Sequence, residues 1–122
     1  MATPNIASPT TINGKTVIMI PSTTSLTQIG SAAATGHIFK VDSITAANVT
    51  GTAATVTLGV YPTTNVTGTP SRIAFQITVP ANASIILVDK AMGLWLDEGQ
   101  SVGVTSGTTN AIEITMVYED IS

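Results

Sequence analysis

Hydrophobic and polar residues alternate along three stretches of the chain, at residues 55–61, 73–79 and 112–118. A strand that covers a core on one side shows this period of two, because successive side chains point to opposite faces. We therefore predict three strands whose hydrophobic sets face the core. These sets are Val56, Leu58 and Val60, then Ile73, Phe75, Ile77 and Val79, and finally Ile112, Ile114, Met116 and Tyr118.

Shorter apolar runs lie before and between these stretches, at residues 17–20, 37–41, 85–88, 94–96 and 102–104. Gly, Pro, Asn and Asp residues, which favour turns, separate the runs, and no helical period continues far enough to form a helix of useful length. About eight short strands of this kind predict an all-β chain with a single antiparallel β-sandwich, either Ig-like or jelly-roll. The number of strands does not choose between these two topologies.

The length of 122 residues fits one domain, residues 1–122. Its first part, residues 1–11, is rich in Pro, Ala and Thr. We expect this segment to form an extended N-terminal arm that reaches a neighbouring molecule.

Two local features of the expected strands depart from regular alternation. The apolar phase slips at Asp42 and Ser43, which predicts a β-bulge. Gly103 lies inside an expected strand and Gly93 lies between two others. Without a phosphate-binding motif around them, these glycines indicate bends or a close approach of another segment.

The composition is dominated by β-branched residues, with 22 Thr, 14 Ile and 11 Val, and only 9% of the residues are charged. An average soluble domain has about 25% charged residues. A surface so poor in charge and so rich in Thr, Ile and Val suits repeated contacts with other proteins. We therefore expect the domain to function against neighbours.

Several classes of protein are excluded or disfavoured by the same composition. The absence of Cys excludes disulfides and Cys-based zinc sites. Four scattered cations and a net charge of −3 argue against nucleic-acid binding. No apolar run approaches the roughly 20 residues of a membrane-spanning helix, and the first ten residues lack the pattern of a signal peptide.

Candidate catalytic chemistry is sparse. His37 is the only histidine, and we interpret it as an ordinary residue at the edge of a strand. A Ser–His–Asp arrangement stays open, because its members need not be close in sequence, but no nucleophile motif is present. Glu119 and Asp120 end the last strand, where we expect them to be solvated. We predict no catalytic residue, no cofactor and no metal site.

Trp95 is the most distinctive candidate for an interface. It lies between Leu94 and Leu96, so it points outward if those two face the core. An exposed Trp is a good interface anchor, although the ring could equally pack within the subunit. With Trp95 we name Ile6 and Ile12 as possible interface residues. Stacking on a sugar is a weaker alternative, since only Trp95, Tyr61 and Tyr118 offer suitable rings.

Five segments carry a resemblance to a known family. They read INGKT from residue 12, HIFKVDSI from residue 37, VPANASIILVDK from residue 79, GLWLDEGQSVGVTS from residue 93, and ITMVYEDIS to the end. In these segments the chain resembles the small virion structural proteins of tailed bacteriophages, particularly those of marine cyanobacteria. The matching positions are turn and strand residues, so the resemblance carries over no catalytic residue.

The resemblance implies a capsid decoration, or cement, protein that binds and stabilises the lattice of the major capsid protein. It implies a homo-oligomer, with a trimer favoured, located on a virion that assembles in the host cytoplasm. Partners would be the major capsid protein or other virion proteins, with no nucleic acid and no membrane. A small neck, tail or fibre protein is the alternative, and a carbohydrate-binding module is a more distant one.

Overall fold

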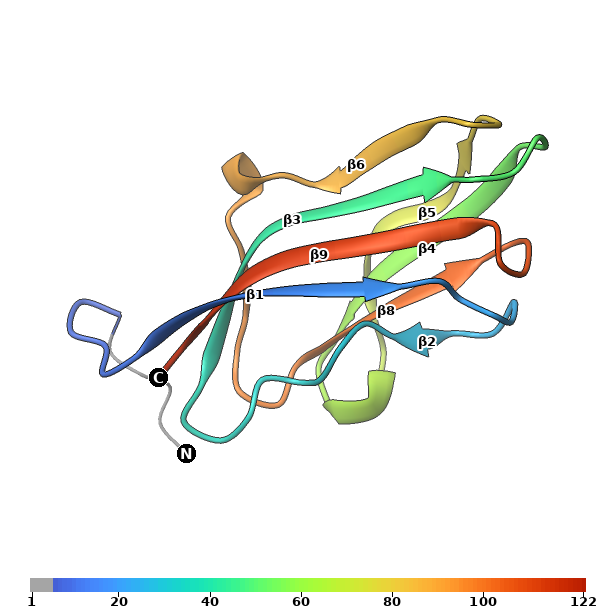
Figure 1. Cartoon of the computed structure of the whole chain (residues 1–122). Coiled ribbons are helices and arrows are strands. Elements are labelled where there is room, and N and C mark those ends of the chain that lie inside the picture. The colour runs from blue at the N-terminus through green and yellow to red at the C-terminus, as the bar shows by residue number, and fades with distance from the viewer. Residues whose placement is uncertain (1–5) are drawn as a thin grey trace.

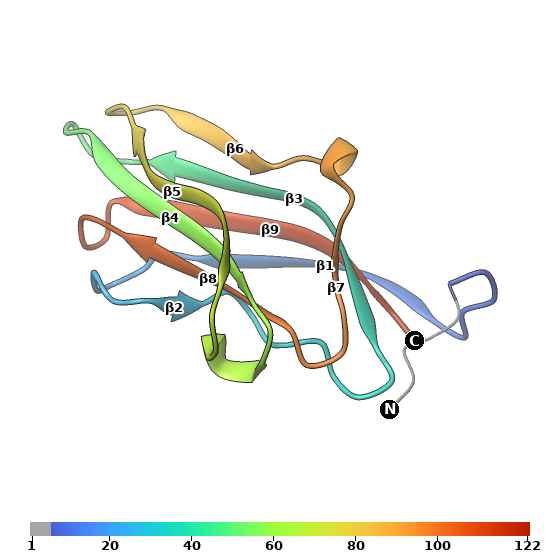
Figure 2. The same cartoon turned by 180° about the vertical axis from the view of Figure 1, so that it is seen from behind.

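The computed structural model describes residues 6–122, which form two antiparallel β-sheets. The strands are β1 (Ile12–Met19), β2 (Thr27–Gln28), β3 (Ile38–Asn48), β4 (Ala54–Tyr61), β5 (Ser71–Val79), β6 (Ser84–Val88), β7 (Leu94–Leu96), β8 (Ser101–Ser106) and β9 (Ile112–Ile121). Sheet A has the order β1-β9-β3-β6, with β7 also paired to β3, and sheet B has the order β2-β8-β4-β5. Figure 1 looks onto sheet A with sheet B behind it, and Figure 2 gives the reverse view.

The strands are connected as a jelly roll. Apart from β7, they pair from the outside inward along the chain: β1 with β9, β2 with β8, β3 with β6, and β4 with β5. Each connection between these eight strands passes from one sheet to the other except the β4–β5 hairpin. Two four-stranded sheets joined in this way define the jelly roll. The predicted β-sandwich is confirmed, and the jelly roll is the topology present.

Helical structure in residues 6–122 is limited to two short 3-10 turns, η1 (Thr64–Val66) and η2 (Lys90–Met92). No described segment forms a helix with the length and apolar character needed to cross a membrane.

The core lies between the two sheets, and β9 shows how the sequence builds it. Ile112, Ile114, Met116 and Tyr118 are buried, while the residues between them are exposed or half-buried. This confirms the period-two prediction for the last strand. β9 is also the strand that joins β1 to β3, so its inner face supports the middle of sheet A.

The predicted β-bulge is present in β3. The register between β3 and β9 shifts between Val41 and Ser43. Val41 is buried before the shift and Ile44 after it. The extra residue therefore keeps the apolar side chains on the core face on both sides of the bulge.

The prediction for β5 is wrong at two residues. Phe75 is 60% exposed and Ile77 is also exposed, whereas Ala74 is buried. The register between β4 and β5 shifts twice, and Gln76 has a φ of 47°. Each extra residue reverses which side chains face the core. In β4 the prediction is confirmed, because β4 pairs with β8 without a register shift: Val56 and Leu58 are buried, and Val60, on the same face, is half-buried and packs against the core.

Gly103 allows a loop to cover part of the outer face of sheet B. A Cβ atom at this position would lie 2.7 Å from Val66 Cγ1 and 2.8 Å from Leu26 Cδ1. The hydroxyl of Ser101 holds the loop in place, since it donates to the carbonyl of Thr63 at 2.6 Å and accepts from the N–H of Val66 at 3.1 Å. The close approach predicted for Gly103 is confirmed.

Gly103→Ala is expected to lower the free energy of unfolding by about 1–2 kcal/mol, because the new methyl group overpacks a closed contact. Denaturant unfolding monitored by circular dichroism measures the change. Gly51→Ala is the matched control, since a Cβ there meets nothing within 4 Å. Equal stability of the two variants would contradict tight packing of the loop on sheet B.

Candidate interaction surface

The outer face of sheet A carries a row of uncharged side chains across all four main strands. Ile18 of β1 pairs with Thr115 of β9, which pairs in turn with Thr45 of β3. Thr45 pairs with Ile86 of β6. Cross-strand partners share a face of the sheet, and this face is opposite the buried Met116. Ile18 is 77% exposed and Ile86 is 69% exposed, so both ends of the row are open and apolar.

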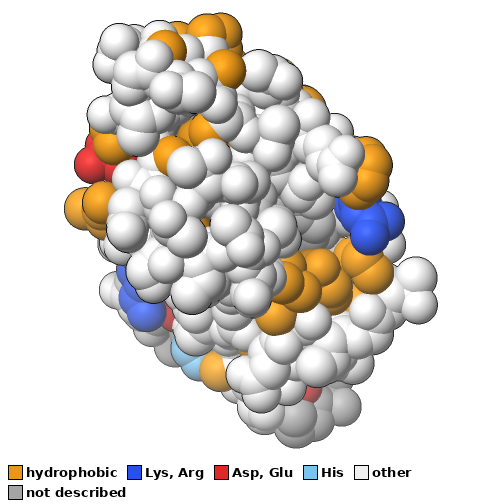
Figure 3. Space-filling model, turned by 90° about the vertical axis from the view of Figure 1, so that its right-hand side faces the viewer, with side chains coloured by type: hydrophobic (Ala, Val, Ile, Leu, Met, Phe, Trp, Pro, Cys, Tyr) orange, Lys and Arg blue, Asp and Glu red, His pale blue; other side chains and the backbone are white. Residues whose placement is uncertain are grey.

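Charged residues occupy a few positions in the paired rows of this face, and the extra residue of the β3 bulge, Asp42, is acidic as well. Lys40 and Glu119 are register partners and form an ion pair with a distance of 3.8 Å between Nζ and Oε2. Glu113 is a further charged residue on the face, opposite Ala47. Figure 3 views one end of the sandwich and not this face; there too, separate hydrophobic groups and few charged side chains lie among uncharged ones. A face of this composition loses little hydration free energy when it is covered by another protein.

Trp95 lies on the outer face of sheet A, as its position in the sequence predicts. It pairs with Lys40, and its flanking residue Leu96 is buried while Leu94 is half-buried. The Lys40 Nζ atom lies 5.9 Å from the centroid of the indole ring, a cation–π distance. Trp95 is 36% exposed, so it is partly covered within the subunit and still available at the surface.

Ile12 and Ile6 are both exposed. Ile12, at the start of β1, pairs with Ile121. The next row of paired residues on this face ends at Trp95, which pairs with Lys40. The structure therefore brings Ile12 and Trp95 to the same sheet, on opposite sides of β9. Ile6 precedes β1 and belongs to no strand.

The expected N-terminal arm, residues 1–11, falls partly outside the described residues. Its last two residues, Thr10 and Thr11, are hydrogen-bonded to the C-terminal residue, Ser122. The N–H groups of Thr10 and Thr11 donate to the carbonyl of Ser122 at 2.6 and 3.0 Å, and the N–H of Ser122 donates to the carbonyl of Thr11 at 2.9 Å. From Thr10 onward the chain therefore continues the β1–β9 ladder.

Asp120 is buried, so the expectation that it is solvated is wrong. It shares the inner face of β9 with Tyr118, because the two residues are two positions apart. Its carboxylate contacts His37 Nδ1 at 2.7 Å and Lys15 Nζ at 3.2 Å. Burial acts to raise the pKa of Asp120, but the hydrogen bonds and positive charges of His37 and Lys15 outweigh it and hold the pKa below its usual value.

The contact between His37 and Asp120 brings together the His and the Asp of the Ser–His–Asp arrangement that the sequence leaves open. In residues 6–122 no Ser or Thr hydroxyl is hydrogen-bonded to the ring of His37. The cluster connects β1, the start of β3 and β9 at one end of sheet A. Its geometry fits a structural clamp.

Asp120→Asn is expected to lower the free energy of unfolding at neutral pH by about 1–2 kcal/mol, since Lys15 and His37 lose a charged partner but can be resolvated. Because the pKa of Asp120 is lowered in the folded chain, its stabilisation is present above the pKa of an unfolded Asp and is lost as the pH falls through the lower folded value. The difference between wild type and variant should therefore shrink as the pH falls below about 4.

Urea unfolding over a pH series, monitored by Trp95 fluorescence, measures this difference. Glu119→Gln is the control, because its ion pair with Lys40 is partly exposed and longer; we expect a change below about 0.5 kcal/mol. If the difference in the free energy of unfolding between wild type and Asp120→Asn stays constant down to strongly acid pH, the structural role of Asp120 is contradicted.

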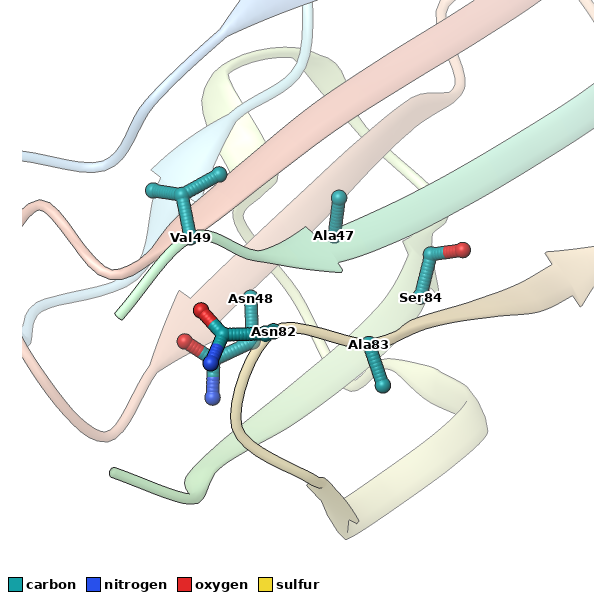
Figure 4. A pocket seen from close by; sticks show the side chains of 6 residues that line it. All are labelled: Ala47, Asn48, Val49, Asn82, Ala83 and Ser84. Atoms are coloured by element: carbon teal, nitrogen blue, oxygen red, sulfur yellow. The ribbon is translucent and has the colours of Figure 1, made fainter. Parts of the chain in front are cut away.

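A shallow depression of about 460 Å³ lies where the end of β3 meets the β5–β6 turn. Figure 4 shows its six lining side chains, which are Ala47, Asn48, Val49, Asn82, Ala83 and Ser84. The amide of Asn48 is already occupied by the protein. It donates to the carbonyls of Thr52 and Val79 at 2.8 and 3.0 Å and accepts from the N–H and hydroxyl of Thr50. The depression is therefore a structural junction between the two sheets.

Metal and sugar sites receive no support from the side-chain arrangement. Among residues 6–122, no three His, Cys, Asp or Glu side chains gather closely enough to hold a metal ion. Tyr61 and Tyr118 are buried, and Tyr118 packs on Phe39 with a centroid distance of 4.7 Å. These two rings do not form an exposed stacking platform with Trp95.

Comparison with known proteins gives no relative: no family model, no curated protein and no solved structure matches this chain.

Proposed function

We propose that this chain is a structural protein of a tailed-bacteriophage virion, a capsid decoration protein that binds and stabilises the lattice of the major capsid protein. It acts through the outer face of sheet A and as a homo-oligomer. The observation that carries the proposal is the row from Ile18 to Ile86, four strands wide, which contains no charged residue and is exposed at both ends.

The row from Ile18 to Ile86 is suited to being covered by another protein. Apolar and hydroxyl side chains on a sheet can be covered by another protein at little cost in desolvation, and they gain stability in proportion to the apolar area buried. A protein that covers the joints between capsid subunits adds buried area there. The added contacts resist the internal pressure of the packaged DNA.

Sheet B is less suited to such a contact. Part of its outer face is already covered by the loop that contains Val66, which approaches Gly103. Its exposed Phe75 lies 5.1 Å from the charged group of Arg72, at the irregular edge strand β5. Jelly rolls occur in viral capsid proteins and also in lectins and cupins, so the surface of sheet A supports the proposal more strongly than the topology does.

Particles purified from the source of this sequence test the proposed location. Quantitative mass spectrometry of separated heads and tails should find the chain with the heads, in a fixed ratio to the major capsid protein. Recovery with the tails would favour the alternative of a neck, tail or fibre protein, to which the same face could bind. Absence from both fractions would contradict a virion role.

A further inference from the structure

The edges of the two sheets differ in how well they are protected against pairing with another strand. β2 has two residues, β6 has five, and β5 has two register shifts along its length. β1 has eight residues paired with β9 without a register shift, and it contains no proline. A long, regular edge strand without such protection is a template for another strand. No described residue pairs with the outer edge of β1.

The hydrogen bonds at the start of the β1–β9 ladder show which backbone groups of β1 are free. Thr11 and Ser122 donate to each other's carbonyls, so they form a hydrogen-bonded pair. Such pairs alternate along an antiparallel ladder. Lys15 and Val17 therefore direct their N–H and C=O groups toward β9. Thr16, between them, directs its groups toward the open edge, as do Gly14 and Ile18.

The side chains of β1 also leave this edge without charge. Lys15 is the only charged residue of the strand, and its ammonium group is bound to Asp120. Ile12, Thr16 and Ile18 are exposed, and Ile20, just after the strand, is exposed as well. A charged side chain aimed along the edge, the usual device against edge-to-edge pairing, is missing from β1.

We propose that β1 pairs antiparallel with β1 of a second copy of this chain, about a two-fold axis through Thr16. This register places Thr16 opposite Thr16, Gly14 opposite Ile18, and Ile12 opposite Ile20. It matches the free backbone groups of one copy with those of the other. A register centred on Lys15 would place two lysines side by side, which is unfavourable.

The pairing joins two A sheets into one sheet of eight main strands, with the outer faces of both copies on the same side. The inference deepens the proposed function, because it names the contact of the homo-oligomer that presents this face to a capsid. A two-fold contact of this kind is closed after two copies. It therefore gives a dimer, whereas the family resemblance implies a trimer.

Light scattering after gel filtration, or sedimentation over a concentration series, tests the pairing on the purified protein alone. Wild type should be a dimer at high concentration. Thr16→Pro removes the N–H that points to the open edge and leaves the bonds to β9 in place, so it should be a monomer throughout with an unchanged circular dichroism spectrum. Thr16→Val keeps the N–H and should remain a dimer.

Ile18→Lys provides a second variant if Thr16→Pro does not fold, since a lysine on the edge should also give a monomer. A wild type that is monomeric at every concentration, or trimeric, would overturn the pairing. A folded Thr16→Pro variant that stays dimeric would overturn it as well. These measurements include no capsids. A negative result would therefore overturn the pairing of β1 without deciding whether the chain binds capsids, which the separation of heads and tails tests.

Discussion

Thr45→Glu combined with Ile86→Glu is expected to weaken binding to the capsid by at least about 100-fold, or roughly 3 kcal/mol. The two residues are register partners on the outer face of sheet A, on the side away from the free edge of β1. Two carboxylates placed in a covered contact without partners lose hydration that nothing replaces. Titration of purified capsids that lack the chain measures the affinity.

The matched control for this pair is Phe75→Glu with Ile77→Glu. Both residues are exposed hydrophobic residues of β5 in sheet B, so the control adds the same charge to the other sheet. Its affinity should stay within about threefold of wild type. If both double variants lose the same affinity for the capsid, net charge and not the outer face of sheet A determines binding.

Asn48→Ala is expected to lower the free energy of unfolding by about 3 kcal/mol. Asn48 is buried at the end of β3, and its side chain bonds the β3–β4 turn at Thr50 and Thr52 and the end of β5 at Val79. Removing the amide leaves buried backbone groups in both sheets without partners, and each such group costs about 1–3 kcal/mol.

Chemical denaturation measures the loss for Asn48→Ala. Ser84→Ala is the control, because Ser84 lines the same depression but is exposed. We expect the control to change stability by less than about 0.5 kcal/mol. An Asn48→Ala variant as stable as this control would contradict the role of the amide as a link between the two sheets.

Sequence patterns predict the central strands of this fold well. β9 is joined on both sides and has one face in the core, so its alternation of apolar and polar residues translates directly into burial. The slip at Asp42 and Ser43 could be recognised because the apolar phase changes within a strand that remains buried on both sides of it. The close approach at Gly103 could be recognised from a glycine inside a strand.

The same patterns fail at the edge strand β5. Its alternation is as regular in sequence as that of β9, but its pairing with β4 shifts twice. An edge strand has a partner on one side only, so a bulge disrupts fewer hydrogen bonds there, and the left-handed backbone at Gln76 changes the face on which Phe75 lies. The alternation of apolar and polar residues in one strand does not reveal where its pairing with the neighbouring strand shifts.

The clamp around Asp120 was missed for a related reason. His37 and Asp120 are 83 residues apart in the sequence, and they meet only because β3 and β9 are neighbours in sheet A. A signal was available, since Asp120 continues the spacing of Ile114, Met116 and Tyr118 on the inner face. Its polarity at the end of the strand led to the wrong expectation that it is solvated.

A cryo-electron microscopy map of the intact particle tests the central proposal most directly. The proposal predicts density for this jelly roll on the outer surface of the capsid, with the outer face of sheet A, from Ile18 to Ile86, against the major capsid protein. Density at the tail, or a copy on the capsid with this face turned to solvent, would contradict it.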